Sequence, residues 1–247
     1  MTGPKASLFV TCIVDQFYPQ VGEATARVLD RLGVDLDFPR DQTCCGQPAF
    51  NAGFWNDAKP LARRFLKVFE GDRYIVAPSG SCVAMVRKFY PELLHDEPDL
   101  ATLARDMAPR VFELTEFIVD VLGVTDLVDG AGKSVARSVT YHEACHLKRE
   151  LGVDRQPRAL LNSLPGVHLV EMPQAEVCCG FGGTFAVKYA DISAAMLQDK
   201  IDSIISTGAD SVVACDASCL MHICGGLSKQ ELPVRATHIA ELLDEAL

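Results

Sequence analysis

The chain has 247 residues, a formal net charge of -10, 49% apolar residues and ten cysteines. Its acidic balance opposes binding to the phosphates of DNA or RNA. No apolar stretch approaches the roughly 20 residues of a membrane-spanning helix, and the first residues lack the pattern of a secretory leader. This apolar content builds a full core without disulfides, so we expect a soluble, cytoplasmic protein with reduced thiols.

Predicted elements alternate between strand and helix along both halves of the chain. In the first half, strands are expected at 7–12, 34–38 and 74–77, and helices at 21–32, 59–69 and 82–89. In the second half, strands are expected at 138–142, 167–171 and 211–214, and helices at 156–164, 191–206 and 220–227. Such alternation is typical of parallel strands joined by helices. The predicted fold class is therefore α/β, with two pseudo-symmetric halves, each a small, mainly parallel sheet flanked by helices.

The cysteines repeat in register between these halves. Cys12, Cys44-Cys45 and Cys82 are matched by Cys145, Cys178-Cys179 and Cys219, with 31 and 32 residues before the pair and 36 and 39 after it. This is an internal repeat of about 135 residues. We expect one cysteine-rich repeat at 1–110, a junction with a linking helix (111–122) at 111–133, and a second repeat at 134–247.

Adjacent cysteines indicate a polynuclear metal site. Two neighbouring thiolates bridge to each other poorly but reach different irons of an iron–sulfur cluster, while the distant cysteines bind from other loops. Secreted disulfides and buried, apolar cysteines are the alternatives, and zinc would also accept four thiolates. The predicted ligands form two sets of four: Cys12, Cys44, Cys45 and Cys82, then Cys145, Cys178, Cys179 and Cys219.

Neighbouring residues have candidate roles at these sites. Loops at the carboxyl ends of parallel strands converge, and thiolates at the beginnings of helices are favoured by the helix dipole, as we expect for Cys82 and Cys219. Ser81 and Ser218 are predicted helix N-caps. Glycines after each cysteine pair let backbone amides approach a cluster, and His146 beside Cys145 is a further candidate. The candidate glycines are Gly46, Gly180, Gly182 and Gly183.

These motifs resemble the CCG cysteine-rich-domain family, which includes heterodisulfide reductase B subunits and the iron–sulfur subunits of glycolate and glycerol-3-phosphate dehydrogenases. Within it, the chain looks most like the lactate-utilisation A group. The similarity rests on APSGSC (77–82), EACH (143–146), CCGFGG (178–183), CLMHI (219–223) and HIAE (238–241). The resemblance implies one iron–sulfur subunit of a three-protein complex that oxidises L-lactate to pyruvate without flavin or nicotinamide, together with a ferredoxin-like partner and a third subunit.

The chain departs from the heterodisulfide reductase pattern. There each motif ends in C-x-x-C and supplies five cysteines, whereas here Pro78 precedes Cys82 in the first half and Cys215 has the wrong spacing to Cys219 in the second. We predict that Cys215 and Cys224 are packing residues. Four ligands per half suit up to one [4Fe-4S] cluster each. Electron transfer in the related dehydrogenases or reductases and a zinc- or cluster-stabilised structural subunit remain the alternative functions.

Overall fold

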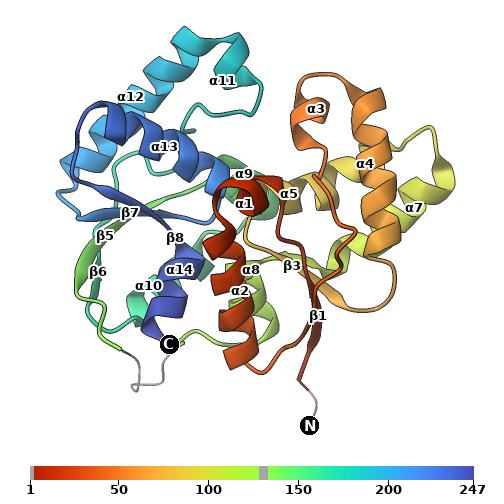
Figure 1. Cartoon of the computed structure of the whole chain (residues 1–247), viewed down its shortest axis with the longest axis horizontal. Helices are drawn as coiled ribbons and strands as arrows, with labels where there is room; N and C mark the ends of the chain where they lie inside the picture. Colours follow the sequence, from red (N-terminus) through yellow and green to blue (C-terminus); the bar gives the residue numbers. More distant parts are fainter. Residues whose placement is uncertain (1–2, 128–132) are drawn as a thin grey trace.

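The protein, described by a computed structural model over residues 3–127 and 133–247, contains two four-stranded sheets in those residues (Figure 1). Every strand pair in them is parallel. The first sheet has the order β2 (Asp35–Asp37), β1 (Lys5–Leu8), β3 (Tyr74–Ala77) and β4 (Val111–Glu113). The second has the order β6 (Val167–Leu169), β5 (Arg137–His142), β7 (Ser211–Ala214) and β8 (Arg235–His238). The identical strand order confirms the predicted α/β fold with two similar halves.

Helices flank both sheets. The first half has α1 (Cys12–Phe17), α2 (Pro19–Arg31), α3 (Gln47–Asn51), α4 (Trp55–Val68), α5 (Gly80–Ala84), α6 (Tyr90–Leu93), α7 (Pro98–Met107) and α8 (Leu114–Glu116). Short π-helical segments continue α5 and α8, and a 3-10 turn follows α7, at Met85–Phe89, Phe117–Val121 and Ala108–Arg110. The second half has α9 (Cys145–Leu151), α10 (Arg155–Ser163), α11 (Phe185–Lys188), α12 (Ala190–Ser206), α13 (Ala217–Lys229) and α14 (Ile239–Ala246).

The two halves share one hydrophobic core. Helix α2 of the first half lies beside α14 of the second (Figure 1), and its buried Val21 and Val28 belong to the same cluster as Leu243 of α14. At the rim of this contact, Arg27 forms an ion pair with Asp244 at 2.8 Å. Because each half buries a helix against the other, their relative orientation is fixed by core packing as well as by the chain connection.

A close approach of α5 to α9 joins the halves near the cysteines. Gly80 begins α5, and a Cβ atom at this position would lie 2.6 Å from Cβ of Leu147 in α9. That is closer than two carbon atoms pack, so only glycine permits this contact between helices. Opposite it, a ring nitrogen of His238 donates to the Pro78 carbonyl at 3.1 Å, which links the two sheets at their carboxyl ends.

Two predicted elements are corrected by the structure. The predicted strand 7–12 ends at Leu8, and Cys12 instead begins α1, after Thr11 with a φ of 73°. The predicted helix 111–122 is wrong at its beginning, because Val111–Glu113 forms the edge strand β4 and helix begins only at Leu114. A three-residue strand has too short a pattern to be separated from a following apolar helix. The division at 110 and 133 stays a prediction, and 128–132 lies outside the described residues.

Candidate metal centre

The four cysteines predicted as ligands in the first half converge at the carboxyl end of their sheet. Cys12 begins α1, the pair Cys44-Cys45 lies in the loop before α3, and Cys82 lies in the first turn of α5. The Sγ atoms of Cys12 and Cys44 are 3.4 Å apart, and those of Cys45 and Cys82 are also 3.4 Å apart. All are free thiols. Parallel-strand topology thus assembles a four-thiol set from three separate segments.

The second half repeats this arrangement. Cys145 begins α9, Cys178-Cys179 precedes α11, and Cys219 lies in the first turn of α13. Cys145 interacts with Cys178, and Cys179 interacts with Cys219, as the corresponding thiols do in the first half. In each pair of adjacent cysteines, Cys44-Cys45 and Cys178-Cys179, the first cysteine is half-buried and the second is buried. The structure therefore brings together each of the two predicted ligand sets.

Glycine holds each cysteine pair in a tight turn. Gly46 has a φ of 86° and Gly180 a φ of 89°, the left-handed region that residues with a Cβ atom rarely adopt. Each glycine donates its backbone N–H to the sulfur two residues earlier, Cys44 or Cys178, at 3.4 Å. A Cβ atom at Gly180 would also lie 2.7 Å from the Ser193 carbonyl oxygen. These amides favour thiolate at the first cysteine of each pair.

Hydrogen bonds among the thiols give neighbouring cysteines different pKa values. Donation from Cys12, then from Cys45 and the Gly46 amide, lowers the pKa of Cys44, and Cys178 is affected in the same way by Cys145, Cys179 and Gly180. The paired thiols of Cys12 and Cys145 have raised pKa values because they donate to those thiolates and are partly buried. Several thiolates so close together need a compensating cation, so the donor chemistry fits a metal centre.

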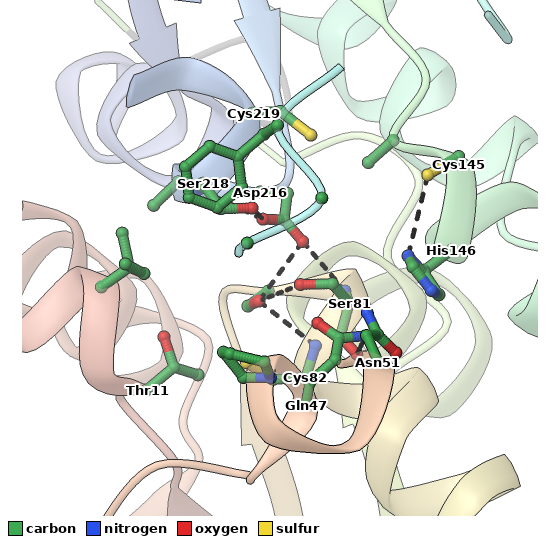
Figure 2. Close-up of a pocket in the computed structure, with 18 of the residues that line it drawn as sticks. Thr11, Gln47, Asn51, Ser81, Cys82, Cys145, His146, Asp216, Ser218 and Cys219 are labelled. Atoms are coloured by element: carbon green, nitrogen blue, oxygen red, sulfur yellow. Dashed lines mark hydrogen bonds between the residues drawn. The ribbon is translucent and has the colours of Figure 1, made fainter. Parts of the chain in front are cut away.

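Both cysteine sets face one cavity between the halves. The cavity has a volume of about 400 Å³. Figure 2 shows Cys82 of the first half on one side and Cys145 and Cys219 of the second half on the other. Seven of the eight predicted ligands line it, and Cys44 lines an adjoining pocket with Cys12. The sequence predicts a site in each half, and the structure adds that these sites open onto a common space.

The predicted helix caps beside the sites were wrong by two residues. Ser79 caps α5 and Asp216 caps α13, whereas Ser81 and Ser218 lie inside the first turns. The carboxylate of Asp216 also reaches across the halves, where Oδ2 accepts the Ser81 N–H at 2.9 Å. Oδ1 accepts the Ser218 N–H at 3.2 Å. One buried carboxylate thus contacts the beginnings of both helices that carry the last cysteine of each set.

The remaining predicted residues also lie at the cavity. His146 Nδ1 is 3.7 Å from Cys145 Sγ (Figure 2). Gly182 and Gly183 of the second half also line the cavity. Gly182 and Gly183 have φ values of 52° and 63°, so glycine suits this loop. None of the described residues that line the cavity is Lys or Arg. Their roles toward a bound group stay predictions.

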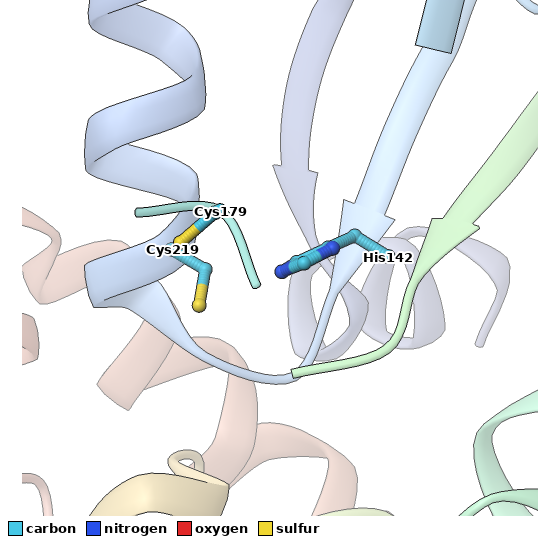
Figure 3. Close-up of side chains that lie close together, drawn as sticks. All are labelled: His142, Cys179 and Cys219. Carbon is cyan, nitrogen blue, oxygen red and sulfur yellow. The ribbon is translucent and has the colours of Figure 1, made fainter. Parts of the chain in front are cut away.

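His142 is a candidate that the sequence analysis did not select. It ends β5, has no exposed surface, and lies with Cys179 and Cys219 in a group whose ligand atoms are within 4.8 Å of one another (Figure 3). Burial lowers the pKa of its imidazole to about 3, so the ring is neutral, the form that binds metals. Its position three residues before Cys145 was the available signal, because an ionisable side chain there ends a buried strand.

The two spare cysteines differ in their surroundings. Cys215 is buried, as predicted, and its Sγ lies 3.4 Å from the hydroxyl oxygen of Tyr141. Cys224 was predicted to be a core residue, but it is exposed on α13. The apolar helix sequence around it suggested burial, whereas residue 224 lies on the helix face that points to solvent.

Replacing these cysteines separately is expected to give different losses of stability with the same iron content. Cys215→Ala removes a buried sulfur and should lower the free energy of unfolding by about 1 kcal/mol, while Cys224→Ala should change it by less than about 0.5 kcal/mol. Chemical denaturation and an iron assay of the reconstituted protein measure both. Loss of iron from Cys215→Ala would instead restore the five-cysteine hypothesis for the second half.

Comparison with known proteins identifies the family. The cysteine-rich domain designated CCG matches the chain twice, at residues 6–87 and 139–224. The chain belongs to the CCG family. Each matched range covers the first three strands of one sheet and one complete cysteine set. This confirms the family resemblance and assigns one CCG domain to each cysteine set.

The CCG protein is similar to curated relatives along nearly its whole length. It is 46% identical to lactate utilization protein A from an Exiguobacterium species, which covers 99% of this chain and 98% of the relative. It is 45% identical to lactate utilization protein A from Bacillus subtilis, which covers 97% and 99% respectively. The crystal structure of a hypothetical protein from Helicobacter pylori matches with a TM-score of 0.64 and 10% identity. That match covers the whole chain but half of the other protein, and it shows the fold alone.

Among the described residues, no helix is both long enough and apolar enough to cross a membrane.

Proposed function

We propose that this protein is an iron–sulfur redox subunit of a multi-subunit complex that oxidises L-lactate to pyruvate. The observation that carries the proposal is the pair of four-thiol sets on one cavity, in a chain 46% identical to a lactate utilization protein. The cysteines Cys12, Cys44, Cys45 and Cys82 would hold one [4Fe-4S] cluster, and Cys145, Cys178, Cys179 and Cys219 the other. When bound, such clusters accept and release single electrons.

The protein's own residues hold and insulate such a centre. The Gly46 and Gly180 amides donate to cysteine sulfur, which lowers the charge density on the thiolates. Cys82 and Cys219 lie in the first turns of α5 and α13, where the helix N-termini place partial positive charge beside the proposed clusters. Cys45, Cys82, Cys179 and Cys219 are buried, so protein and not water surrounds half of each ligand set.

The proposal assigns substrate oxidation to the assembled complex. Converting lactate to pyruvate releases two electrons and two protons, and the described lining of the cavity offers no Lys or Arg side chain to bind a carboxylate. His146 is the neighbouring group that could take a proton. We therefore include a ferredoxin-like iron–sulfur subunit and a third subunit as partners. A cytoplasmic location keeps the ten free cysteines reduced.

Anaerobic reconstitution with ferrous iron and sulfide tests the cofactor. The intact chain should bind about eight irons and about eight acid-labile sulfides, as expected for two [4Fe-4S] clusters, and reduction should give an electron paramagnetic resonance signal. Cys45→Ser should lower the iron content by about half. Cys224→Ser, at an exposed cysteine, serves as the matched control and should bind as much iron as the original chain.

A zinc-stabilised structural subunit is the second candidate function. The observation that favours it is the group of His142, Cys179 and Cys219, because one imidazole and two thiolates within 4.8 Å can bind a single zinc ion. Tight, stoichiometric zinc binding with no retained iron or sulfide in the reconstitution experiment would support this function and contradict the redox proposal.

A further inference from the structure

The imidazole of His142 is buried but has no hydrogen-bond partner for either ring nitrogen among the described residues. The side chain has no exposed surface. A buried polar atom without a partner costs about 1–3 kcal/mol, so such an atom is rare unless a ligand satisfies it. The Ala175 carbonyl lies close enough to affect the pKa of the ring, but it is outside hydrogen-bond geometry for either ring nitrogen, and Lys200 donates to it at 3.2 Å.

The orientation of the imidazole ring indicates the kind of group that it binds. Figure 3 shows the imidazole at the end of β5 pointing at the sulfur atoms of Cys179 and Cys219, which come from a different loop and from α13. A ring nitrogen and these two sulfurs lie within 4.8 Å of one another, yet the ring forms no hydrogen bond with either sulfur. Metal–nitrogen and metal–sulfur bonds are about 2.1 and 2.3 Å long, so three atoms at this spacing are suited to contact a common metal centre.

The first half has a different residue at the corresponding position. Phe9 stands three residues before Cys12, as His142 stands three residues before Cys145. Phe9 is also fully buried, but it packs on Phe65 and Phe69 with ring centroids at 5.0 and 5.6 Å. The fold therefore accepts an apolar ring at this place, and the second half instead holds a metal-binding one.

We infer that His142 binds the metal centre of the second half through a ring nitrogen, beside Cys179 and Cys219, so that the two centres have different donor sets. This inference rests on the proposed iron–sulfur function. The first centre then has thiolate donors alone, and the second has thiolates plus a neutral imidazole. Because donor type sets the reduction potential of an iron–sulfur centre, the two centres then have different reduction potentials.

Pulsed electron paramagnetic resonance of the full chain tests the inference without a mutation. The chain is reconstituted anaerobically with iron and sulfide, once with natural histidine and once with histidine labelled with ¹⁵N. We expect the strong nitrogen coupling of a directly bound imidazole, changed by the label. Unchanged iron content with no strong nitrogen coupling overturns the inference but leaves the proposed function intact. Failure to bind iron at all overturns both.

Two exchange variants identify the histidine. His142→Phe copies the residue of the first half and retains His146 near Cys145, so the strong coupling should disappear and the potentials of the two centres should become more alike. Phe9→His should introduce a second nitrogen coupling and shift the potential of the first centre toward that of the second. Circular dichroism verifies folding of each variant. Coupling that persists in a folded His142→Phe protein assigns the nitrogen to another histidine and overturns the inference.

Discussion

Replacing Cys179 with Ser is expected to stop lactate-dependent electron transfer by the assembled complex. Cys179 is buried, interacts with Cys178 and Cys219, and lies in the group that includes His142. Serine keeps the size of the side chain but is a poor ligand for iron in this setting. If both centres lie on the electron path, loss of one interrupts it. The rate should fall by more than the roughly 10- to 100-fold that results from losing a residue that only supports a metal ligand.

The measurement mixes this protein with its ferredoxin-like and third subunits and follows reduction of an artificial electron acceptor by L-lactate. The isolated subunit should be inactive, and the three proteins together should be active. Cys215→Ser is the matched control, since Cys215 is a buried cysteine of the same half outside the predicted ligand set. A Cys179→Ser complex that assembles and turns over at the normal rate would show that the second centre is structural.

The core strands of the fold could be predicted because their sequence pattern is unambiguous. Strands β3 and β7 occupy the predicted ranges 74–77 and 211–214, where short runs of buried residues end at turn residues. The edge strands β4 and β8 could not be predicted. β4 continues directly into an apolar helix. In β8 buried and exposed residues hardly alternate, since Arg235 is exposed and only His238 is buried. The other two edge strands, β2 and β6, lie within the predicted ranges 34–38 and 167–171, so local sequence pattern and not edge position explains the difference.

The ligand sets were predictable from the repeat, but their position in space was not. The repeated cysteine spacing indicates which cysteines belong to the same ligand set. The common cavity, in contrast, depends on how α2 packs on α14 and how α5 packs on α9. Those contacts join residues far apart in the chain. His142 could have been found by aligning the repeats, because it replaces Phe9 at a buried position. The cap at Asp216 depended on where β7 ends, which sequence patterns locate only to within a few residues.

Stability is expected to fall as the pH rises from about 5 to about 8, because of Glu113 at the end of β4. Its carboxyl group is fully buried, Oε2 accepts the Thr115 N–H at 2.8 Å, and Oε1 has no partner among the described residues. Burial raises the pKa of Glu113 from 4.5 to about 8. Between these values the folded protein keeps a proton that the unfolded chain has released. Stability therefore decreases with pH, by at most on the order of 5 kcal/mol.

Glu113→Gln should remove this part of the pH dependence, because the neutral amide has nearly the shape of the protonated carboxyl group. Urea denaturation at pH 5, 6, 7 and 8 under reducing, anaerobic conditions measures the free energy of unfolding of both proteins. The difference between them should grow in favour of Glu113→Gln as the pH rises, since only the original chain must bury a charge or retain a proton against its solution equilibrium. Glu70→Gln, at an exposed position, controls for the change in net charge. Parallel curves for the original chain and Glu113→Gln across this range would mean that Glu113 is ionised in the folded protein at pH 5, contrary to its burial beside Thr115 and Cys215.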